Sequence, residues 1–315
     1  MTLRFGLCCQ FLDSPIHFRT ATHRYVSTLS RAGRRTYLAG IAADNAAALL
    51  AAVERCAELG IGAFRVNSQI LPLGTHPVSG YLLEALDRKG EIRAAFARAG
   101  ARARELDVRL SFHPDQFVVL NSERADVVRG SVEELEFQSA IAELIGADTV
   151  VLHGGSVAGG TGPALERLER GMDLLSDRAR RRVALENDDH RFTPTDLLPL
   201  CHRMAVPLVY DAHHHRCHGD GLSVEAATDL AAATWDRREP WAHISSPREG
   251  WDAANPRPHA GYIDPRDFPP AWTGRRMTVD VEAKEKERAV LRLMGDVEAA
   301  PPRRGRSGKT TSKRR

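Results

Sequence analysis

Eight short runs rich in β-branched and apolar residues, separated by longer helical patterns, limit most strongly how this chain can fold. Strands that alternate with helices favour parallel pairing through βαβ units. Eight such units close into a barrel, whereas an open doubly wound sheet more often has about five to seven strands. The pattern therefore predicts an α/β fold of the (β/α)₈ TIM barrel class. The runs are Leu3–Cys9, Ala63–Ser68, Arg109–His113, Thr149–His153, Arg182–Asn187, Pro207–His213, Trp241–Ser246 and Met277–Ala283.

The helical patterns between these runs support the same architecture. In the first, Leu49, Val53 and Cys56 recur every three to four residues, as one buried helix face requires. No GxGxxG follows the first strand, so we expect no nucleotide cofactor. Segments 11–41 and 247–276 interrupt the alternation and are expected to be loops on the rim of the barrel. The clearest helical patterns are Asn45–Leu59, Ile92–Leu106, Val132–Ile145, Ala164–Ser176, Val224–Ala233 and Glu285–Leu293.

The charge of the chain divides it into a body and a tail. Residues 301–315 contain seven Lys or Arg and no acid, whereas the rest has 37 Lys and Arg against 41 Asp and Glu. We expect one barrel domain over residues 1–300 and a disordered tail over 301–315. The tail either adds nonspecific contacts to phosphates or is solvated without a role.

Targeting signals and cysteine motifs are not evident. The N-terminus lacks a basic segment followed by an apolar run, and no stretch reaches the roughly 18–20 uncharged apolar residues of a membrane span. We therefore expect a cytoplasmic monomer without a membrane partner. Five cysteines without a CxxC pair suggest neither a disulfide framework nor a thiolate zinc site.

Histidines and carboxylates stand at the ends of the predicted strands. Because the C-terminal strand ends of a barrel converge on one face, these side chains should meet there. Each alone could be a structural hydrogen-bonding group, or, for Glu282, a partner of Lys284. Burying so many together without metal would cost several kcal/mol per unpaired charge, so the coincidence predicts a multinuclear metal site. The third to eighth runs supply His113, His153, Glu186, Asp211 with His214, His243 and Glu282, while His76 and His259 lie in loops after the second and seventh.

The donor types narrow the choice of metal. Imidazoles mixed with carboxylates suit manganese, zinc or iron and are too rich in nitrogen for magnesium or calcium. Eight or nine ligands exceed what one ion needs, so we expect two or three divalent ions, Mn²⁺, Zn²⁺ or Fe²⁺, bridged by Glu186. If the sixth strand ends near Ala212, Asp211 and His214 both reach the metals, and His213 or His215 supports them from behind.

Several motifs together resemble the UV damage endonucleases, over about residues 2–294. They are RLSFHPDQFVVLNS, VVLHGGS, ALENDD, LVYDAHHHRC, HISS, HAGYI and VEAKEKE, in this order and spacing. Those enzymes are barrel nucleases related in fold to endonuclease IV. The resemblance implies cleavage of duplex DNA on the 5′ side of a UV photoproduct, without ATP and with three divalent metals, for which Mn²⁺ is the first expectation.

The resemblance also implies roles for individual residues. Gln116 and Phe117 would wedge into the duplex beside the lesion, although Phe117 alone would be interpreted as core. The family often has Tyr and Asn on the first strand, where this chain has Leu7-Cys8-Cys9-Gln10-Phe11, so Gln10 or Phe11 would contact the lesion instead. Trp241 stands where some members have a lysine near the metals. The implied metal ligands are His76, His113, His153, Glu186, Asp211, His214, His243, His259 and Glu282, with Glu186, His113 and Glu282 serving catalysis.

Other assignments from the residues remain open. Arg65, Arg216 and Lys284 are candidates to hold flanking DNA phosphates, or they form surface ion pairs. A metal-dependent sugar isomerase or aldolase would gather similar ligands around a small closed pocket, where the wedge would have no purpose. An apurinic-site endonuclease would use the same metals without UV specificity. A pure binding module would not explain so costly a cluster.

Overall fold

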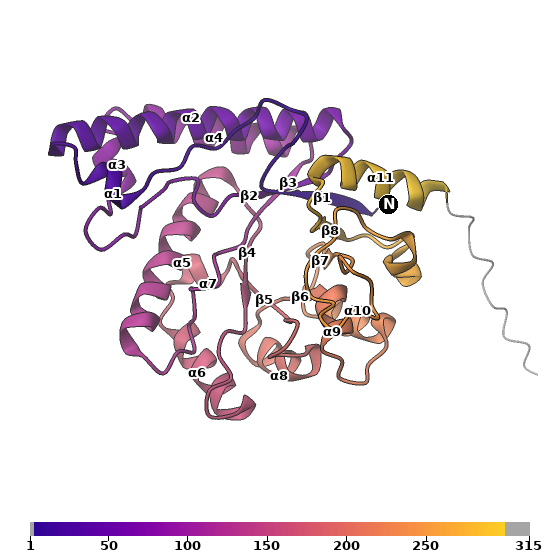
Figure 1. Ribbon diagram of the computed structural model, residues 1–315. Helices are drawn as coiled ribbons and strands as arrows, with labels where there is room; N and C mark the ends of the chain where they lie inside the picture. The colour runs from indigo at the N-terminus through magenta and orange to yellow at the C-terminus, as the bar shows by residue number, and fades with distance from the viewer. Residues whose placement is uncertain (1–2, 300–315) are drawn as a thin grey trace, which may run out of the picture.

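The computed structural model describes residues 3–299 and contains a closed barrel of eight parallel strands in sequential order (Figure 1). The barrel closes where Phe5 of the first strand pairs with Val279 of the last. The predicted TIM barrel is therefore confirmed, and the tail over 301–315 lies outside the described residues. The strands are β1 (Arg4–Cys8), β2 (Ala63–Val66), β3 (Arg109–Phe112), β4 (Thr149–His153), β5 (Val183–Glu186), β6 (Leu208–Asp211), β7 (Trp241–Ile244) and β8 (Thr278–Val281).

The helices cover the outside of this barrel. All six helical patterns singled out in the sequence correspond to observed helices. The helices are α1 (His23–Val26), α2 (Arg31–Glu58), α3 (Leu83–Leu86), α4 (Glu91–Glu105), α5 (Ala125–Ile145), α6 (Thr161–Asp173), α7 (Asp177–Arg180), α8 (Pro194–Met204), α9 (Ala212–Cys217), α10 (Val224–Ala233) and α11 (Lys286–Ala299), with short 3₁₀ turns η1 (Pro265–Asp267) and η2 (Pro270–Trp272).

Helix α2 corrects the prediction that residues 11–41 form a loop. It begins at Arg31, where the Ser30 hydroxyl accepts a hydrogen bond from the Gly33 backbone N–H. Its buried face starts with Leu38 and Ile41, and the helix runs alongside α4 (Figure 1). Only the segment before Arg31 lacks long regular structure.

The length and composition of α2 would also allow it to cross a membrane. This differs from the expectation that no stretch is long and apolar enough. Somewhat less than half of its most apolar stretch is buried in the protein, and one such helix is weak evidence because core helices meet the same criteria. Its packing on α4 and β2 accounts for its apolar face.

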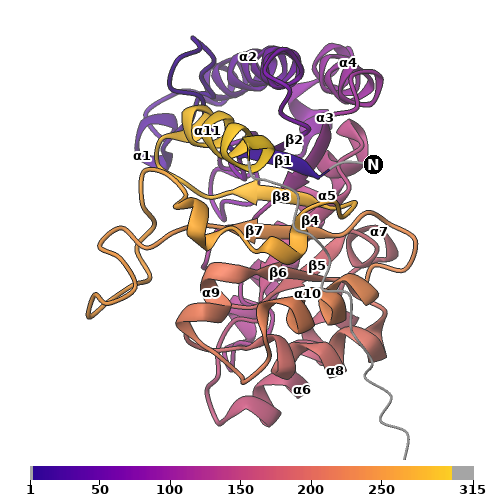
Figure 2. The same ribbon diagram turned by 90° about the vertical axis from the view of Figure 1, so that its right-hand side faces the viewer.

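The segment after β7 is largely irregular, as predicted for 247–276. Pro247 and His259 form an antiparallel bridge that closes a loop at its base. Figure 2 shows this orange loop projecting away from the barrel. The loop therefore returns the chain to the barrel at His259, one of the predicted ligands.

Candidate metal centre

Glu186 lies at the C-terminal end of β5 and is fully buried. Its Oε2 atom lies 2.9 Å from Nε2 of His113 and 4.0 Å from Nε2 of His153. Its Oε1 atom lies 3.0 Å from Nδ1 of His243 and 3.3 Å from Nδ1 of His214. The parallel strands thus bring four histidines from separate elements onto one carboxylate.

Two groups of three ligand atoms share this carboxylate. The first is His113, His153 and Glu186, and the second is Glu186, Asp211 and His214; within each, the three atoms lie within 4.8 Å of one another. A carboxylate common to two groups is the arrangement by which proteins hold paired metal ions. These groups could therefore bind metal.

Further predicted ligands extend the cluster toward β8. Oε1 of Glu282 lies 3.5 Å from Nδ1 of His243, and its Oε2 atom lies 3.6 Å from Nδ1 of His259. Eight of the nine predicted ligands consequently lie in one continuous cluster around Glu186 and Glu282. The sequence prediction that strand ends assemble these side chains agrees with their placement.

His76 is the exception. It lies in the segment after β2, where its ring stacks on His23 with centroids 4.3 Å apart, and its Nδ1 accepts hydrogen bonds from the backbone N–H groups of Val78 and Ser79. Within residues 3–299, none of its contacts is with the cluster. The path of its loop thus directs the imidazole away from the cluster in this structure, and the assignment of His76 as a ligand stays a prediction.

A third acidic group follows Glu186 directly, at Asp188, Asp189 and His190. One carboxylate oxygen of Asp188 accepts hydrogen bonds from the backbone N–H groups of His190, Arg191 and Phe192. That carboxylate shapes the loop between β5 and α8. This group is accordingly explained by loop structure.

The donor atoms of the cluster fit divalent ions. Glu186 Oε1, Asp211 Oδ2 and His243 Nδ1 are buried and have no hydrogen-bond partner among the described residues. Buried polar atoms are nearly always partnered, because an unpartnered one costs free energy. Three such atoms directed at one place are those that a metal ion would satisfy.

The electrostatics of the cluster agree with this fit. Complete burial opposes ionisation of Glu186, yet the neighbouring His243 and His153 hold its pKa well below the usual range. Burial likewise opposes protonation of His214, but Asp211 and Glu186 raise its pKa well above the usual value. Protons on the histidines therefore balance the negative charge of the buried carboxylates, and bound cations would displace those protons.

The turn from β6 into α9 brings Asp211 and His214 together. Asp211 caps α9 by accepting a hydrogen bond from the His214 backbone N–H at 2.7 Å. The strand ends at Asp211, next to the predicted end near Ala212. His215 is held between Tyr210 and Asp220, each at 2.8 Å, and His213 Nε2 lies 3.2 Å from the Arg257 carbonyl oxygen.

The three candidate phosphate-binding residues have different positions. Arg65 lies inside the barrel, 7% exposed, with contacts to Asp280 and Glu282, so it is neither a surface ion pair nor freely available to a phosphate. Arg216 lies over the Trp251 ring, 3.8 Å from the Asp267 carboxylate. Lys284 is exposed.

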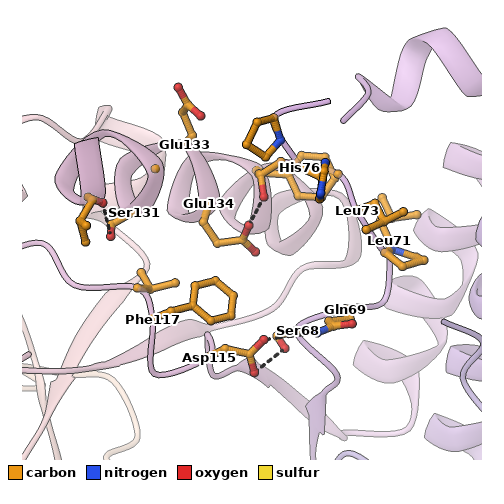
Figure 3. A pocket seen from close by; sticks show the side chains of 18 residues that line it. Ser68, Gln69, Leu71, Leu73, His76, Asp115, Phe117, Ser131, Glu133 and Glu134 are labelled. Carbon is orange, nitrogen blue, oxygen red and sulfur yellow. Dashed lines mark hydrogen bonds between the residues drawn. The ribbon is translucent and has the colours of Figure 1, made fainter. Parts of the chain in front are cut away.

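The Gln116–Phe117 pair follows β3 immediately after the ligand His113. Phe117 is 65% exposed, so the alternative that it is a core residue is wrong. It lines a cavity of about 430 Å³, with His76 across from it and Asp115 beside it (Figure 3). A second, open cavity of about 600 Å³ connects His113 and His153 with Gln116 and Phe117.

The end of β1 completes this surface. Gln10 is exposed, whereas Phe11 is buried and stacks on Phe64, so only Gln10 is available to a bound molecule. Trp241 faces the barrel interior on the same side of β7 as His243, and the Arg109 guanidinium lies 4.3 Å from its ring centre. The Trp241 side chain therefore contributes packing at this position and provides no atom that could bind a metal.

Comparison with known proteins gives a consistent picture. The family model of "UV-endonuclease UvdE" matches residues 3–302. The UV DNA damage endonuclease of Deinococcus radiodurans is 34% identical and covers 92% of this chain and 95% of its own. That of a Nostoc species is 31% identical and covers 91% of this chain and 88% of its own.

Solved structures agree on the fold. The crystal structure of SacUVDE matches with a TM-score of 0.82 and 26% identity, covering 94% of this chain and 98% of that chain. Endonuclease IV from Thermus thermophilus matches with a TM-score of 0.61 and 18% identity, covering 94% of this chain and 100% of that chain. This is a likeness of fold. D-psicose 3-epimerase from Clostridium cellulolyticum matches with a TM-score of 0.54 and 10% identity, covering 94% of this chain and 97% of that chain. This too is a likeness of fold alone.

Proposed function

The chain belongs to the UV-endonuclease UvdE family, and on that premise we propose that it is an endonuclease for UV-damaged duplex DNA. It hydrolyses the phosphodiester on the 5′ side of a photoproduct, with divalent metal ions and without ATP. The substrate is damaged double-stranded DNA, and manganese is the first candidate for the metal.

One observation carries this proposal. The cluster around Glu186 and the exposed Gln116–Phe117 pair line the same open cavity, through His113 and His153. The proposed hydrolytic centre would thus lie beside a polar and an aromatic side chain suited to entering a duplex. A sugar isomerase would need a closed pocket, and an exposed aromatic wedge would serve no purpose in it.

The donor set supports a division of the ligands among the metals. His113, His153 and Glu186 would hold one ion, and Glu186, Asp211 and His214 a second, with His243, His259 and Glu282 available for a third. Bound divalent ions supply Lewis-acid activation of a phosphate and lower the pKa of water from about 15.7 toward 7.

The protein's own side chains prepare the site for this chemistry. Burial keeps Glu186 out of bulk water, and the histidines on both its oxygens fix the direction of the carboxylate. Arg65 fixes the outer carboxylate Glu282 through a hydrogen bond of 2.6 Å. Phe117 and Gln116 would hold the duplex open, so that the lesion and its 5′ phosphate approach the cluster.

The proposal is tested with an end-labelled duplex that carries one cyclobutane pyrimidine dimer. We expect a single cut immediately 5′ of the dimer in the presence of Mn²⁺, loss of the cut with EDTA, and no cut in the undamaged duplex. A matched duplex with an abasic site distinguishes the related activity. Cleavage of the abasic duplex alone would assign the protein to apurinic sites, and no cut by metal-loaded protein would overturn the proposal.

A further inference from the structure

Residues 14–43, here named the basic segment, have a charge unlike the rest of the described chain. They contain five Arg and two His but no Asp or Glu. Without this segment and the tail over 301–315, the chain carries 32 Lys and Arg against 41 Asp and Glu. Positive charge is therefore concentrated in one segment of an otherwise acidic body.

Chain topology places the basic segment on the face of the barrel that carries the metal cluster. The segment follows β1, and connections after strands lie at their C-terminal ends. It contains α1 and the first turns of α2. His23 of α1 stacks on His76, and His76 lines the cavity that Phe117 borders (Figure 3). The segment thus continues the surface that begins at the wedge.

The start of α2 is an unfavourable place for its arginines. Arg31 is the first residue of the helix, Arg34 and Arg35 follow within the next turn, and the first turn contains no acid. The positive end of the helix dipole lies there, so each nearby cation destabilises the helix. An anionic partner would remove this cost, because helix N-termini and arginines both favour phosphate.

Three of these arginines are available to a partner. Arg24, Arg31 and Arg35 are exposed, and none forms an ion pair with another residue of the range 3–299. Tyr25, next to Arg24 in the chain, is 49% exposed, and its ring centre lies 5.0 Å from that of Tyr37, two residues beyond Arg35. Arginine and tyrosine side chains are typical contacts of the DNA backbone.

We propose that Arg24, Arg31 and Arg35, with Tyr25, form a surface that binds the phosphate backbone of the duplex on one flank of the lesion. This inference rests on the proposed function, because it assigns part of the same DNA-binding face. The contacts are to phosphates, so they hold damaged and undamaged duplex alike and position the lesion without recognising it.

The test compares two triple variants of the full chain. The first is Arg24→Gln/Arg31→Gln/Arg35→Gln. The control, Arg104→Gln/Arg181→Gln/Arg237→Gln, removes the same charge from exposed arginines without ion pairs in the described structure, located just before β3, β5 and β7 at the opposite end of the barrel. Fluorescence anisotropy gives the Kd of damaged and undamaged duplexes in EDTA over a series of KCl concentrations.

Each lost phosphate contact lowers the slope of log K against log salt concentration by about 0.9. We expect the first variant to lose roughly two to three units of slope and to bind both duplexes at least about tenfold more weakly at low salt. The control should keep the slope of the unmodified protein. Equal slopes for the two variants would overturn the inference.

Duplex length provides a second readout. With the DNA shortened on one side of the lesion, the difference between the unmodified protein and the first variant should disappear; shortening the other side should preserve it. A difference that survives both truncations would contradict contact with one flank. Failure of the unmodified protein to cut dimer-containing DNA would instead overturn the proposed function, while the slopes on undamaged duplex still test this surface.

Discussion

Nη1 of Arg65 on β2 lies 2.6 Å from Oε1 of Glu282, which directly follows β8. The two strands are not neighbours, because β1 lies between them. Nε of the same guanidinium donates to Asp280 at 3.1 Å, and Nη2 lies 2.8 Å from Nε2 of His243. Arg65 therefore connects the cluster to a buried carboxylate just beneath it.

Replacement of Arg65 by methionine keeps much of its volume and removes its charge. Asp280 would then be buried without a cation, and breaking such a buried pair costs about 3–5 kcal/mol of unfolding free energy. Urea denaturation in EDTA measures this loss without metal. Arg19→Met removes the exposed pair with Asp44 and should cost at most about 1 kcal/mol. Equal losses in both variants would show that the buried position of Arg65 adds nothing.

Gly6 on β1 is required for this arrangement. A Cβ atom at this position would lie 2.1 Å from Oδ1 of Asp280. Gly6→Ala should therefore displace the carboxylate and lower the free energy of unfolding by about 1–3 kcal/mol. Gly40→Ala in α2 meets nothing within 4 Å and should be neutral or stabilising by up to about 1 kcal/mol. Thermal unfolding of both variants measures the difference. An unchanged stability of Gly6→Ala would show that the barrel interior accommodates the additional methyl group.

Glu186→Gln tests the shared carboxylate. The amide keeps the size of the side chain but removes the charge common to both ligand groups. We expect loss of bound metal, measured by mass spectrometry of the purified protein, and loss of cleavage by at least about a hundredfold, with DNA affinity unchanged. The exposed Glu166→Gln is the control. Full metal content in Glu186→Gln would contradict the shared role.

The barrel and most of the cluster were predictable for a shared physical reason. Residues at the ends of β3 to β6 are fixed by strand register, so their place in the sequence determines their place in space. His76 lies ten residues beyond Val66, the end of β2, where the path of a loop decides. The spacing of apolar residues does not indicate that path, so the assignment of His76 as a ligand stays a prediction.

Arg65 and α2 show two further limits of the sequence. All four residues of β2 are buried, so the strand shows no alternation of buried and exposed positions. An alternation of apolar and polar residues could therefore not indicate that Arg65 points into the barrel. The first turns of α2 carry Arg31, Gly33, Arg34 and Arg35 and show no apolar face. The helix forms there because Ser30 caps it and Leu38 begins its packing, which a search for apolar spacing does not detect.

Asp220 predicts an acid-dependent part of the stability. It accepts hydrogen bonds from the Thr195 hydroxyl at 2.6 Å, from the Leu222 backbone N–H at 2.9 Å and from His215. Although burial opposes its ionisation, these bonds lower its pKa below the usual value. Its contribution is therefore present above the unfolded-state pKa of about 3.9 and is lost as pH falls through the lower folded-state pKa.

Asp220→Asn should reduce the free energy of unfolding by about 1–3 kcal/mol at pH 7. The difference from the unmodified protein should begin to shrink below about pH 4, where the aspartate of the unfolded chain becomes protonated, and should shrink further as pH falls toward the lower folded-state pKa. Denaturation curves at several pH values measure it, with the exposed Asp252→Asn as the control. If the difference in free energy of unfolding does not change with pH, the hydrogen bonds of Asp220 contribute through their geometry and not through the charge of the carboxylate.

The wedge makes the most direct prediction about recognition. An aromatic side chain stacked on a base contributes about 1–3 kcal/mol, or roughly a fivefold to 150-fold change in affinity. Gln116→Ala/Phe117→Ala should therefore reduce the ratio of affinities for dimer-containing and undamaged duplex by at least about tenfold, while metal content stays unchanged. Leu174→Ala, similarly exposed at 60%, should leave the ratio as it is. If the double variant keeps the ratio and loses cleavage instead, these residues act on the approach of the phosphate to the cluster rather than on the lesion.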